Sequence, residues 1–400
     1  MEDLPKTWQI KKVSDLMTEV KDRIVPTESN ATNYVGLEHI QSYGKLIGRG
    51  DSNDVKSTKT VFKTNDVLYA KLRPYLNKHV VANFDGVCST DILVYRNPNT
   101  NTSKLFNYWL DLESSIKLIN AEAKGINLPR VSASILNSFE IPVPPDNELS
   151  SIIAKLDTLF AHLDQLKARL QNIPTLLKQF RQAVLTQAVT GKLNDGQLKL
   201  FTIEHLTNFI GSGVTPRGGN ENYFKEGIPF IRSMNVYPEG LYLENLAFIT
   251  KEMHDDMSRS KIKDKDVLLN ITGASIGRAT YIPQGFGEGN VNQHVCILRC
   301  NEKIIPEFLA IYLNSNEAQS YIMGTQVGMT RQGLNYSQIR AMPIPVPEVK
   351  EQNEIVRRVE SLFAVADRIE ASYHTLQEKI DHLPQAILSK AFRGELVTRS

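Results

Sequence analysis

The sequence lacks the features that mark several large classes of protein. Three cysteines in 400 residues exclude a disulfide scaffold and suit a reducing compartment. No run approaches the roughly 18 apolar residues that a membrane-spanning helix needs, and the charged opening MEDLPKTWQI lacks the apolar stretch of a signal peptide. Lysine and arginine total 46 against 44 aspartate and glutamate, so no overall basic surplus points to nucleic acid. These absences predict a cytoplasmic, multidomain protein with no membrane segment.

Familiar catalytic motifs are missing as well. Neither G-x-x-x-x-G-K-[ST] nor G-x-G-x-x-G occurs, because Gly211 and Gly213 are followed by Pro216. H-E-x-x-H, G-x-S-x-G and the N/D-P-P-Y/F motif of amino-methyltransferases are also absent. Cys296 and Cys300 fall on one face of a predicted strand without a second Cys/His pair nearby, so we interpret them as packing residues. We expect neither a catalytic residue nor a metal site in this chain.

What the sequence does have is an internal repeat. Residues 141–193 and 344–396 are identical at 17 of 53 ungapped positions, at an offset of 203. Chance would give about one match in 15 to 20. Weaker matches upstream, such as FKTNDVL (62–68) with IKDKDVL (262–268), extend the duplication through the chain. We predict four parts: a first module (1–145), a central helical region (146–195), a second module (196–343) and a C-terminal helical region (344–400).

Both helical regions carry a heptad pattern. Apolar residues alternate at spacings of three and four over residues 149–184, and the pattern recurs over 355–387. Two seams in the same register predict an intramolecular antiparallel coiled coil with a module at each end. Pro174 and Pro384 fall inside the seams, so each region is expected to consist of two helical pieces. The seam residues are Leu156, Leu159, Leu163, Leu166, Leu170, Val359, Leu362, Ile369, Leu376 and Ile380.

Other apolar residues lie off the seam. A bundle core is the ordinary interpretation of the seam, but the apolar stripe is wider than two helices need. A wider stripe favours contact with another protein. The predicted partner-docking residues are Phe160, Leu176, Phe363 and Phe392. Gly191 and Gly394 stand where a glycine commonly ends a helix.

The two modules have the pattern of mixed α/β domains. Short β-type runs, such as TVFKTNDVLYAKL (60–72) and VNQHVCILRC (291–300), come first, and helical segments follow. This order predicts an α+β fold rather than a doubly wound sheet.

Polar side chains gather near the predicted turns of both modules. Arginine, asparagine and glutamine can read guanine and adenine edges, while lysine, serine and threonine contact phosphates. Ordinary solvated loops are the alternative interpretation. The predicted DNA-contacting residues are Lys71, Arg73, Tyr75, Asn77, Lys78 and His79 in the first module, and Arg232, Asn235, Ser275, Arg278, Asn292, Gln293, His294 and Arg331 in the second.

With these parts in place, the chain resembles the specificity (S) subunit of type I restriction–modification enzymes. The resemblance rests on the LPKTW opening, the IPVP entries at 141 and 344, and the helical segments 156–193 and 350–396. These segments look like the conserved regions of the type IA group. The first entry reads PDNELSSI where the family usually has E-Q, whereas the second keeps Glu351 and Gln352.

The resemblance implies two target recognition domains, each reading one half of a bipartite, asymmetric DNA site. It implies that the helical regions form an antiparallel spacer that docks two modification (M) subunits, which bind S-adenosylmethionine and methylate adenine N6. Two restriction (R) subunits would add cleavage that depends on ATP and Mg²⁺. This chain would bind double-stranded DNA without any cofactor of its own, as a non-catalytic subunit in the nucleoid of a bacterium or archaeon. The alternatives are a modification-only complex, a coiled-coil scaffold whose modules bind protein, and an autonomous enzyme, which the missing motifs disfavour.

Overall fold

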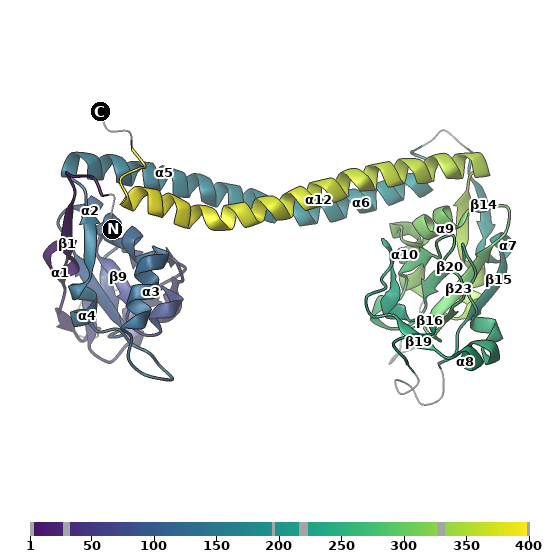
Figure 1. Ribbon diagram of the computed structural model, residues 1–400, viewed down its shortest axis with the longest axis horizontal. Coiled ribbons are helices and arrows are strands. Elements are labelled where there is room, and N and C mark those ends of the chain that lie inside the picture. Colours follow the sequence, from purple (N-terminus) through teal and green to yellow (C-terminus); the bar gives the residue numbers. More distant parts are fainter. Residues whose placement is uncertain (1–3, 27–32, 194–196, 216–222, 326–332, 398–400) are drawn as a thin grey trace. The chain divides into compact units, whose positions relative to one another are not determined.

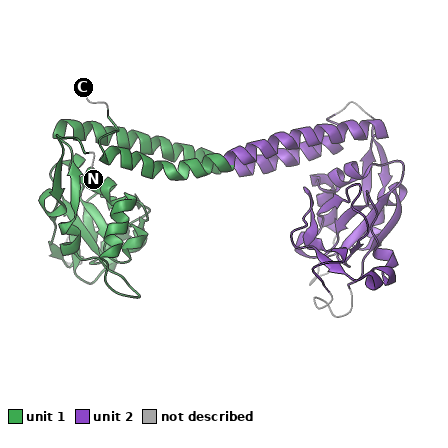
Figure 2. Cartoon of the chain, in the orientation of Figure 1, with its two compact units in different colours: residues 1–171, 374–400 green, residues 172–373 purple. Residues whose placement is uncertain are grey.

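The computed structural model describes residues 4–26, 33–193, 197–215, 223–325 and 333–397. The chain forms two compact units (Figure 2): unit 1 comprises residues 1–171 and 374–400, and unit 2 comprises residues 172–373. Each unit therefore joins one module to helical stretches from two distant parts of the sequence. The division runs through the helical regions, whereas the predicted boundaries at residues 145, 195 and 343 separate those regions from the modules.

The module of unit 1 is built on two main sheets. One has the strand order β10 (His79–Val81), β9 (Val67–Ala70), β12 (Ile92–Arg96), β2 (Thr18–Glu19). The other has the order β3 (Arg23–Ile24), β8 (Lys59–Phe62), β11 (Gly86–Cys88), β4 (Asn33–Val35), β7 (Gly50–Asp51). Two strand pairs are separate: β1 (Gln9–Lys12) with β13 (Glu140–Val143), and β5 (Ile40–Gln41) with β6 (Lys45–Leu46). The module's helices are α1 (Val13–Leu16), α2 (Thr100–Leu110), α3 (Glu113–Ala121) and α4 (Ala133–Ser138).

The module of unit 2 repeats this plan. Its sheets have the orders β15 (Thr207–Ser212), β23 (Val295–Cys300), β20 (Val267–Asn270), β21 (Ala279–Tyr281) and β19 (Ala247–Ile249), β16 (Ile228–Ile231), β22 (Asn290–Val291). The separate pairs are β14 (Lys199–Thr202) with β24 (Pro343–Val346), and β17 (Val236–Tyr237) with β18 (Gly240–Leu241). The helices are α7 (Ile203–Leu206), α8 (Lys251–Asp256), α9 (Pro306–Leu313), α10 (Asn316–Thr325) and α11 (Tyr336–Ala341). The predicted α+β fold and its duplication are confirmed.

Three helices make up the two helical regions, and Figure 1 shows them: α5 (Asp146–Gln171), α6 (Ile173–Val189) and α12 (Val349–Phe392). The first region is in two pieces, as predicted, with Pro174 in the first turn of α6, where its missing N–H is not needed. The prediction is wrong for the second region, because Pro384 lies inside α12. Ile380 and Leu388, which precede and follow this proline in α12, are buried, and their burial stabilises the helix despite one lost hydrogen bond.

The helices share a core with the module of their own unit. In unit 1, Leu149 and Leu156 of α5 and Leu388 of α12 join Phe106 and Trp109 of α2 in one apolar cluster. Contact between the start of α5 and the end of α12 makes this pair antiparallel. In unit 2, Val184 of α6 and Val359 of α12 join the module's core in the same way. Each unit is thus held together by burial of apolar surface from both its module and its helices.

Only one of the two predicted seam rows is fully buried. The buried seam residues are Leu156, Leu163, Leu170, Val359 and Ile380, and the half-buried ones are Leu159 and Leu362. Leu166, Ile369 and Leu376 are 45%, 46% and 44% exposed. Each helix pair therefore uses one row for its own contact, while part of the second apolar row is exposed to solvent.

The described residues lack two further features. None of the helices there is long and apolar enough to cross a membrane. The same parts of the chain hold no group of three or more His, Cys, Asp or Glu side chains arranged to hold a metal ion.

Candidate nucleic-acid interface

Three segments of the first module meet where strand β9 ends. Lys71 follows β9, donates its backbone N–H to the carbonyl of Asp91 at 2.9 Å and accepts from Val131 N–H at 3.0 Å. The N–H of Arg73 donates to the carbonyl of Pro129 at 2.7 Å. Backbone bonds thus fix the end of β9, the turn before β12 and the loop between α3 and α4 to one another. We call this arrangement the first loop junction.

Basic side chains surround this junction. Lys71 Nζ and Arg130 Nε lie 3.9 and 3.7 Å from Asp91 Oδ1, so one carboxylate orients two cations. Arg73 and Lys124 are exposed. Local positive charge of this kind provides phosphate contacts even where the chain as a whole is nearly neutral.

The loop of residues 122–131 is closed at its base. Lys124 and Arg130 exchange two backbone hydrogen bonds of 2.9 Å, and Gly125 takes a φ of +110°, which glycine adopts readily. The tip carries Ile126, whose side chain is 100% exposed, and the exposed Leu128. DNA-binding proteins use exposed apolar side chains between basic residues as wedges against bases. The loop therefore presents exposed apolar side chains next to exposed basic ones.

Arg73 occupies a backbone conformation that normally belongs to glycine. Its φ is +52°, and the residue at the same place in the second module is Gly273, with φ of +77°. A left-handed conformation costs a non-glycine residue on the order of 1 kcal/mol or more. An arginine at this position thus comes at a conformational cost that a glycine would avoid.

The duplication brings the same three segments together in the second module. Ile271 follows β20, donates its N–H to the carbonyl of His294 at 3.0 Å and accepts from Leu334 N–H at 2.9 Å. Thr272 pairs with Gly333 in an isolated bridge. We call this the second loop junction. Its side chains differ from those of the first, since Thr272 Oγ1 and His294 Nδ1 lie 2.6 Å apart where the first junction has ion pairs.

Several predicted DNA-contacting residues lie at these junctions with accessible side chains. They are Lys71, Arg73 and Tyr75 in the first module and Gln293 and His294 in the second. Tyr75 lies in the short turn η4 (Pro74–Leu76), directly after Arg73. Their role as DNA contacts stays a prediction.

Asn77 and His79 are buried, which corrects their predicted role. His79 Nδ1 lies 2.8 Å from Asn107 Oδ1, and His79 Nε2 lies 2.9 Å from Asp111 Oδ1. Asn77 Nδ2 donates to the same carboxylate oxygen at 3.0 Å. Burial alone lowers the pKa of His79, but the charge of Asp111 and hydrogen bonds from His79 to Asp111 and Asn107 outweigh it, so the pKa lies above its usual value. These residues link β10 to α2, and their side chains are enclosed within the module.

Asn235 and Asn292 are also buried and shape the backbone of unit 2. Asn235 accepts from Arg232 N–H at 3.0 Å and donates to the carbonyl of Tyr242 at 2.8 Å. Asn292 Oδ1 accepts from His294 N–H at 3.1 Å. Both side chains are buried, and the Asn235 amide and the Asn292 oxygen are bonded inside the module, so a base-reading role is not supported for either residue.

Lys78 and Ser275 are half-buried and bonded within their modules. Lys78 Nζ donates to the carbonyl of Leu37 at 2.7 Å. Ser275 Oγ accepts from Asn270 Nδ2 at 3.1 Å. Both side chains are thus held by contacts within their own modules, and their role as DNA contacts stays a prediction.

The three arginines that were predicted to contact DNA in the second module differ in their positions. Arg232 Nη2 donates to the carbonyl of Asn245 at 2.8 Å. Arg278 lies over the ring of Tyr237 at 4.7 Å and lines a pocket beside α6 rather than the second loop junction. Arg331 lies outside the described residues.

The DNA contacts predicted from the sequence did not include three residues of this loop, Lys124, Ile126 and Arg130. The signal for them was the repeat itself, because residues 328–333, which contain Arg331, correspond to residues 125–130 at an offset of 203. Because Arg331 was among the predicted DNA contacts, subtracting 203 would have directed attention to the loop of the first module as well.

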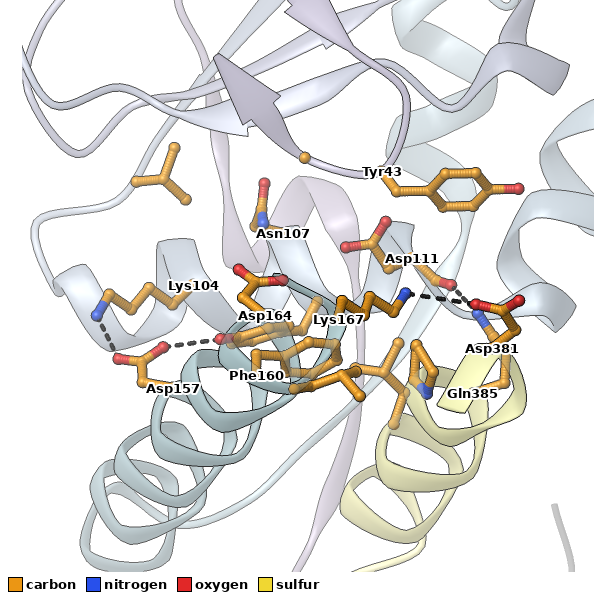
Figure 3. A pocket seen from close by; sticks show the side chains of 16 residues that line it. Tyr43, Lys104, Asn107, Asp111, Asp157, Phe160, Asp164, Lys167, Asp381 and Gln385 are labelled. Atoms are coloured by element: carbon orange, nitrogen blue, oxygen red, sulfur yellow. Dashed lines mark hydrogen bonds and ion pairs between the residues drawn. The ribbon is translucent and has the colours of Figure 1, made fainter. Parts of the chain in front are cut away.

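A cavity of about 630 Å³ lies between the module and the helices of unit 1 (Figure 3). Its labelled lining residues are Tyr43, Lys104, Asn107, Asp111, Asp157, Phe160, Asp164, Lys167, Asp381 and Gln385. Phe160 stacks on Tyr108 of α2 at 5.4 Å between ring centroids. This predicted docking residue therefore lines the cavity between its own module and helices.

The remaining predicted docking residues have mixed positions. Leu176 is exposed, and Phe363 lies beneath the guanidinium of Arg181 at 5.4 Å. Phe392 is buried in the shared core of unit 1, so its side chain is not available to a partner. The solvent-facing apolar surface is instead the second seam row, which includes Leu166 and Leu376.

The chain is similar in sequence to several known proteins of one kind, the specificity subunits of type I restriction enzymes. The chain is 35% identical over 314 residues to the EcoBI type I restriction enzyme specificity subunit of Escherichia coli, across 72% of this chain and 65% of that protein. It is 30% identical over 299 residues to the EcoKI specificity subunit of E. coli strain K12, across 70% and 63%. The alignments thus span just under two thirds of the length of these relatives.

Solved structures share the fold at low identity. The HsdS subunit from Thermoanaerobacter tengcongensis matches with a TM-score of 0.69 and 19% identity, over 98% of each chain. A chain from a type I R-M system, solved in a study of its assembly and conformational transition, matches with a TM-score of 0.73 and 19% identity, over 99% of this chain and 100% of that one.

The family model of the type I restriction modification DNA specificity domain matches residues 5–175 and 195–378. These two stretches take in both modules and most of the helices that follow each of them, with the same duplication that the fold displays. The chain therefore belongs to the type I restriction–modification DNA specificity family.

Proposed function

We propose that this chain is the DNA-specificity subunit of a type I restriction–modification complex, in which each module reads one half of a bipartite, asymmetric site. The observation that carries the proposal is the pair of loop junctions. Both use equivalent backbone bonds at the end of a central strand, but the first presents Lys71, Arg73 and Arg130, whereas the second presents Thr272 and His294. One scaffold with two sets of side chains suits two different half-sites.

The helices in this proposal set the spacing of the half-sites and dock two modification subunits. The exposed second seam row supports docking, because an apolar row of this kind along a coiled coil is usually covered by another helix. Leu166 and Leu376 belong to it in unit 1, and Ile369 in unit 2. This surface replaces most of the docking residues expected from the sequence.

The chemistry would reside in the partners. Under this proposal S-adenosylmethionine binds to the modification subunits, which methylate adenine N6 after flipping the base. ATP and Mg²⁺ belong to two restriction subunits, and this chain is a non-catalytic, cytoplasmic subunit of a bacterium or archaeon. Family membership and the relatives' names, which are those of specificity subunits, support the recognition role of this chain, and the partners' cofactors are part of the proposal.

Mapping N6-methyladenine in host DNA with and without this gene tests the proposal. We expect one split motif that disappears when the gene is deleted. An unchanged methylation map would overturn the proposal. Because α5 packs against the end of α12, seven residues added to both helices should lengthen the gap and leave the half-site bases unchanged.

A protein-binding scaffold is the second candidate, favoured by the same exposed apolar row. Footprinting of the chain with its modification subunit separates the two, because a scaffold gives no sequence-dependent protection of DNA. A modification-only complex is distinguished by a purified assembly that methylates its site but does not cleave unmethylated DNA in the presence of ATP and Mg²⁺.

A further inference from the structure

The cavity of unit 1 in Figure 3 carries more negative than positive side chains. Its wall includes four carboxylates and two lysines: Asp111, Asp157, Asp164, Asp381, Lys104 and Lys167. Lys104 Nζ lies 2.6 Å from Asp157 Oδ2, and Lys167 Nζ lies 3.9 Å from Asp381 Oδ1. Within the described part of the chain, the Asp164 carboxylate has no hydrogen bond or ion pair. The lysines leave two carboxylates, and Asp111 is bonded to Asn77 and His79, so Asp164 is the one carboxylate of this wall without a partner among the described residues.

Unit 2 has an equivalent pocket, and the side chain of Arg181 lies in it. The equivalent pocket of unit 2 is lined by residues displaced by 203, so that Phe363 and Asp367 correspond to Phe160 and Asp164. There Arg181 Nη2 donates to Asp367 Oδ1 at 2.7 Å and to Glu370 Oε2 at 2.9 Å. The same guanidinium lies over the ring of Phe363 at 5.4 Å. An aromatic ring and two carboxylates together bind an arginine in this half.

Unit 1 keeps this ring and carboxylate but lacks the arginine. The residue at the position of Arg181 is Pro384, which carries no charge. Lys167 stands where unit 2 has Glu370, and its amine is directed to Asp381 on the opposite helix (Figure 3). Phe160 and Asp164 therefore form one part of an arginine site whose guanidinium the described chain does not supply.

We propose that the cavity of unit 1 receives an arginine side chain from a partner protein. The identity of the partner rests on the proposed function, under which the partner is one of the two modification subunits. Charge complementarity favours a cation, and the planar guanidinium fits a ring and a carboxylate better than the compact ammonium of lysine does. Tyr43, which is 64% exposed on the module side of the cavity, offers a second aromatic surface.

A consequence is that the two helix pairs are not equivalent docking sites. Unit 2 supplies its own guanidinium through Arg181, whereas unit 1 takes one from outside. Two copies of the same partner should therefore bind with different affinities, and loss of the acceptor in unit 1 should affect only one binding step.

The first experiment tests the site without any partner. Ligand-observed NMR of the full-length chain with N-acetyl-L-arginine amide should show binding that Asp164→Arg and Pro384→Arg abolish. Pro384→Arg places the chain's own guanidinium where unit 2 has Arg181, and removing an interior proline favours the helix, so a folding defect is not expected. Asp256→Arg, an exposed charge reversal on α8 outside the cavity, is the matched control and should leave binding unchanged. Absence of arginine binding to the wild-type chain, or equal binding by all variants, overturns the inference.

The second experiment identifies the source of the arginine. Titration of the full-length chain with its modification subunit, followed by native mass spectrometry, should show two copies bound. Asp164→Arg and Pro384→Arg should weaken one step about tenfold to a hundredfold, the range for a lost charged hydrogen bond, and leave the other unchanged. An arginine-to-aspartate change in the partner that restores binding to Asp164→Arg supports the assignment.

Two further outcomes separate the possible failures. Arg399 lies outside the described residues; if Arg399→Ala alone abolishes the effect of Asp164→Arg, the arginine belongs to this chain and the partner assignment is overturned. If the wild-type chain binds the arginine probe but no modification subunit, the proposed function fails, and the arginine site is still supported by its own measurement.

Discussion

Asp66 and Arg96 form a two-pronged ion pair in the first module. Arg96 Nε and Nη2 donate to Asp66 Oδ1 and Oδ2 at 2.7 and 2.6 Å, and the carboxylate also accepts from Lys63 N–H. Asp266 and Arg299 repeat the arrangement in the second module at 2.8 Å for both bonds. In each module the pair ties the turn before a central strand to the neighbouring strand, with a carboxylate that is almost completely buried.

We expect Asp66→Asn and Asp266→Asn each to destabilise its own unit by roughly 3 kcal/mol, because the substitution leaves a partly buried arginine without its counter-charge. Hydrogen–deuterium exchange of the full chain measures this, with faster exchange confined to the unit that carries the change. Glu395→Gln is the control, since the Arg393–Glu395 pair has similar geometry but is exposed and should contribute little. Equal effects of all three substitutions would contradict the burial argument.

His79 and Asp111 make the stability of unit 1 depend on pH. The folded state raises the pKa of His79 above its usual value, so the pair stabilises the fold fully below about pH 6.5, and this contribution is lost as pH rises through the folded pKa. We expect amides of β10 and α2 to exchange faster at pH 8 than at pH 6, after correction for intrinsic rates.

Unit 2 supplies the control for this prediction. At the corresponding positions it has Ala279 and Asn314, which are joined by neutral hydrogen bonds of 3.2 and 2.8 Å. The double substitution His79→Ala with Asp111→Asn should therefore remove the pH dependence and cost less stability than His79→Ala alone, which leaves a carboxylate unpaired. Persistence of the pH dependence in the double variant would rule out this pair as its source.

Gln385 and Gln182 occupy equivalent positions but have different contacts. Gln385 Nε2 donates to the carbonyl of Asp111 at 2.7 Å and Gln385 Oε1 accepts from Glu113 N–H at 2.8 Å, so α12 caps the turn between α2 and α3. Gln182 Oε1 is buried without a hydrogen-bond partner in the described residues of unit 2. We expect Gln385→Ala to destabilise unit 1 by about 1–3 kcal/mol and Gln182→Ala to have a smaller effect or none. Urea unfolding followed separately in each unit by hydrogen exchange distinguishes the two, and a larger loss from Gln182→Ala would count against the observed hydrogen bonds.

The helical regions show which features of the fold the heptad pattern predicts and which it does not. The heptads predicted the antiparallel pairs, but not which row is buried, because a two-helix coil normally buries both. In this chain the module covers another face of the same helices through residues such as Ile153 and Phe160, and the second row stays exposed. The same pattern treated Pro174 and Pro384 alike, although only Pro174 falls in the first turn of a helix.

The loop junctions show why the candidate site was harder to predict. Arg73 and Asn77 are polar residues of one turn, and composition gives no means of separating them. The difference arises from long-range packing, because Asn77 lies against α2, where it bonds to Asp111, while Arg73 is fixed through its backbone to Pro129. The repeat alignment could match Asp66 with Asp266, but their arginine partners are 30 and 33 residues further along the chain on another strand.

Arg73→Gly gives the sharpest test of the first loop junction, because stability and recognition should change in opposite directions. Glycine is the residue that the second module uses at this left-handed position, so the substitution should stabilise unit 1 by roughly 1 kcal/mol. Loss of the guanidinium should relax the base preference at one half-site by about 1–3 kcal/mol, or roughly tenfold to a hundredfold in discrimination, and leave the other half-site unchanged. Thermal unfolding measures the first effect, and N6-methyladenine mapping in a host that carries the variant measures the second. Arg278→Ala is the comparison, since its side chain lies over Tyr237 beside the helices and should leave both half-sites intact. A uniform loss of methylation across all sequences with Arg73→Gly would make Arg73 a phosphate contact, and a loss of stability would show that its backbone conformation carries no strain.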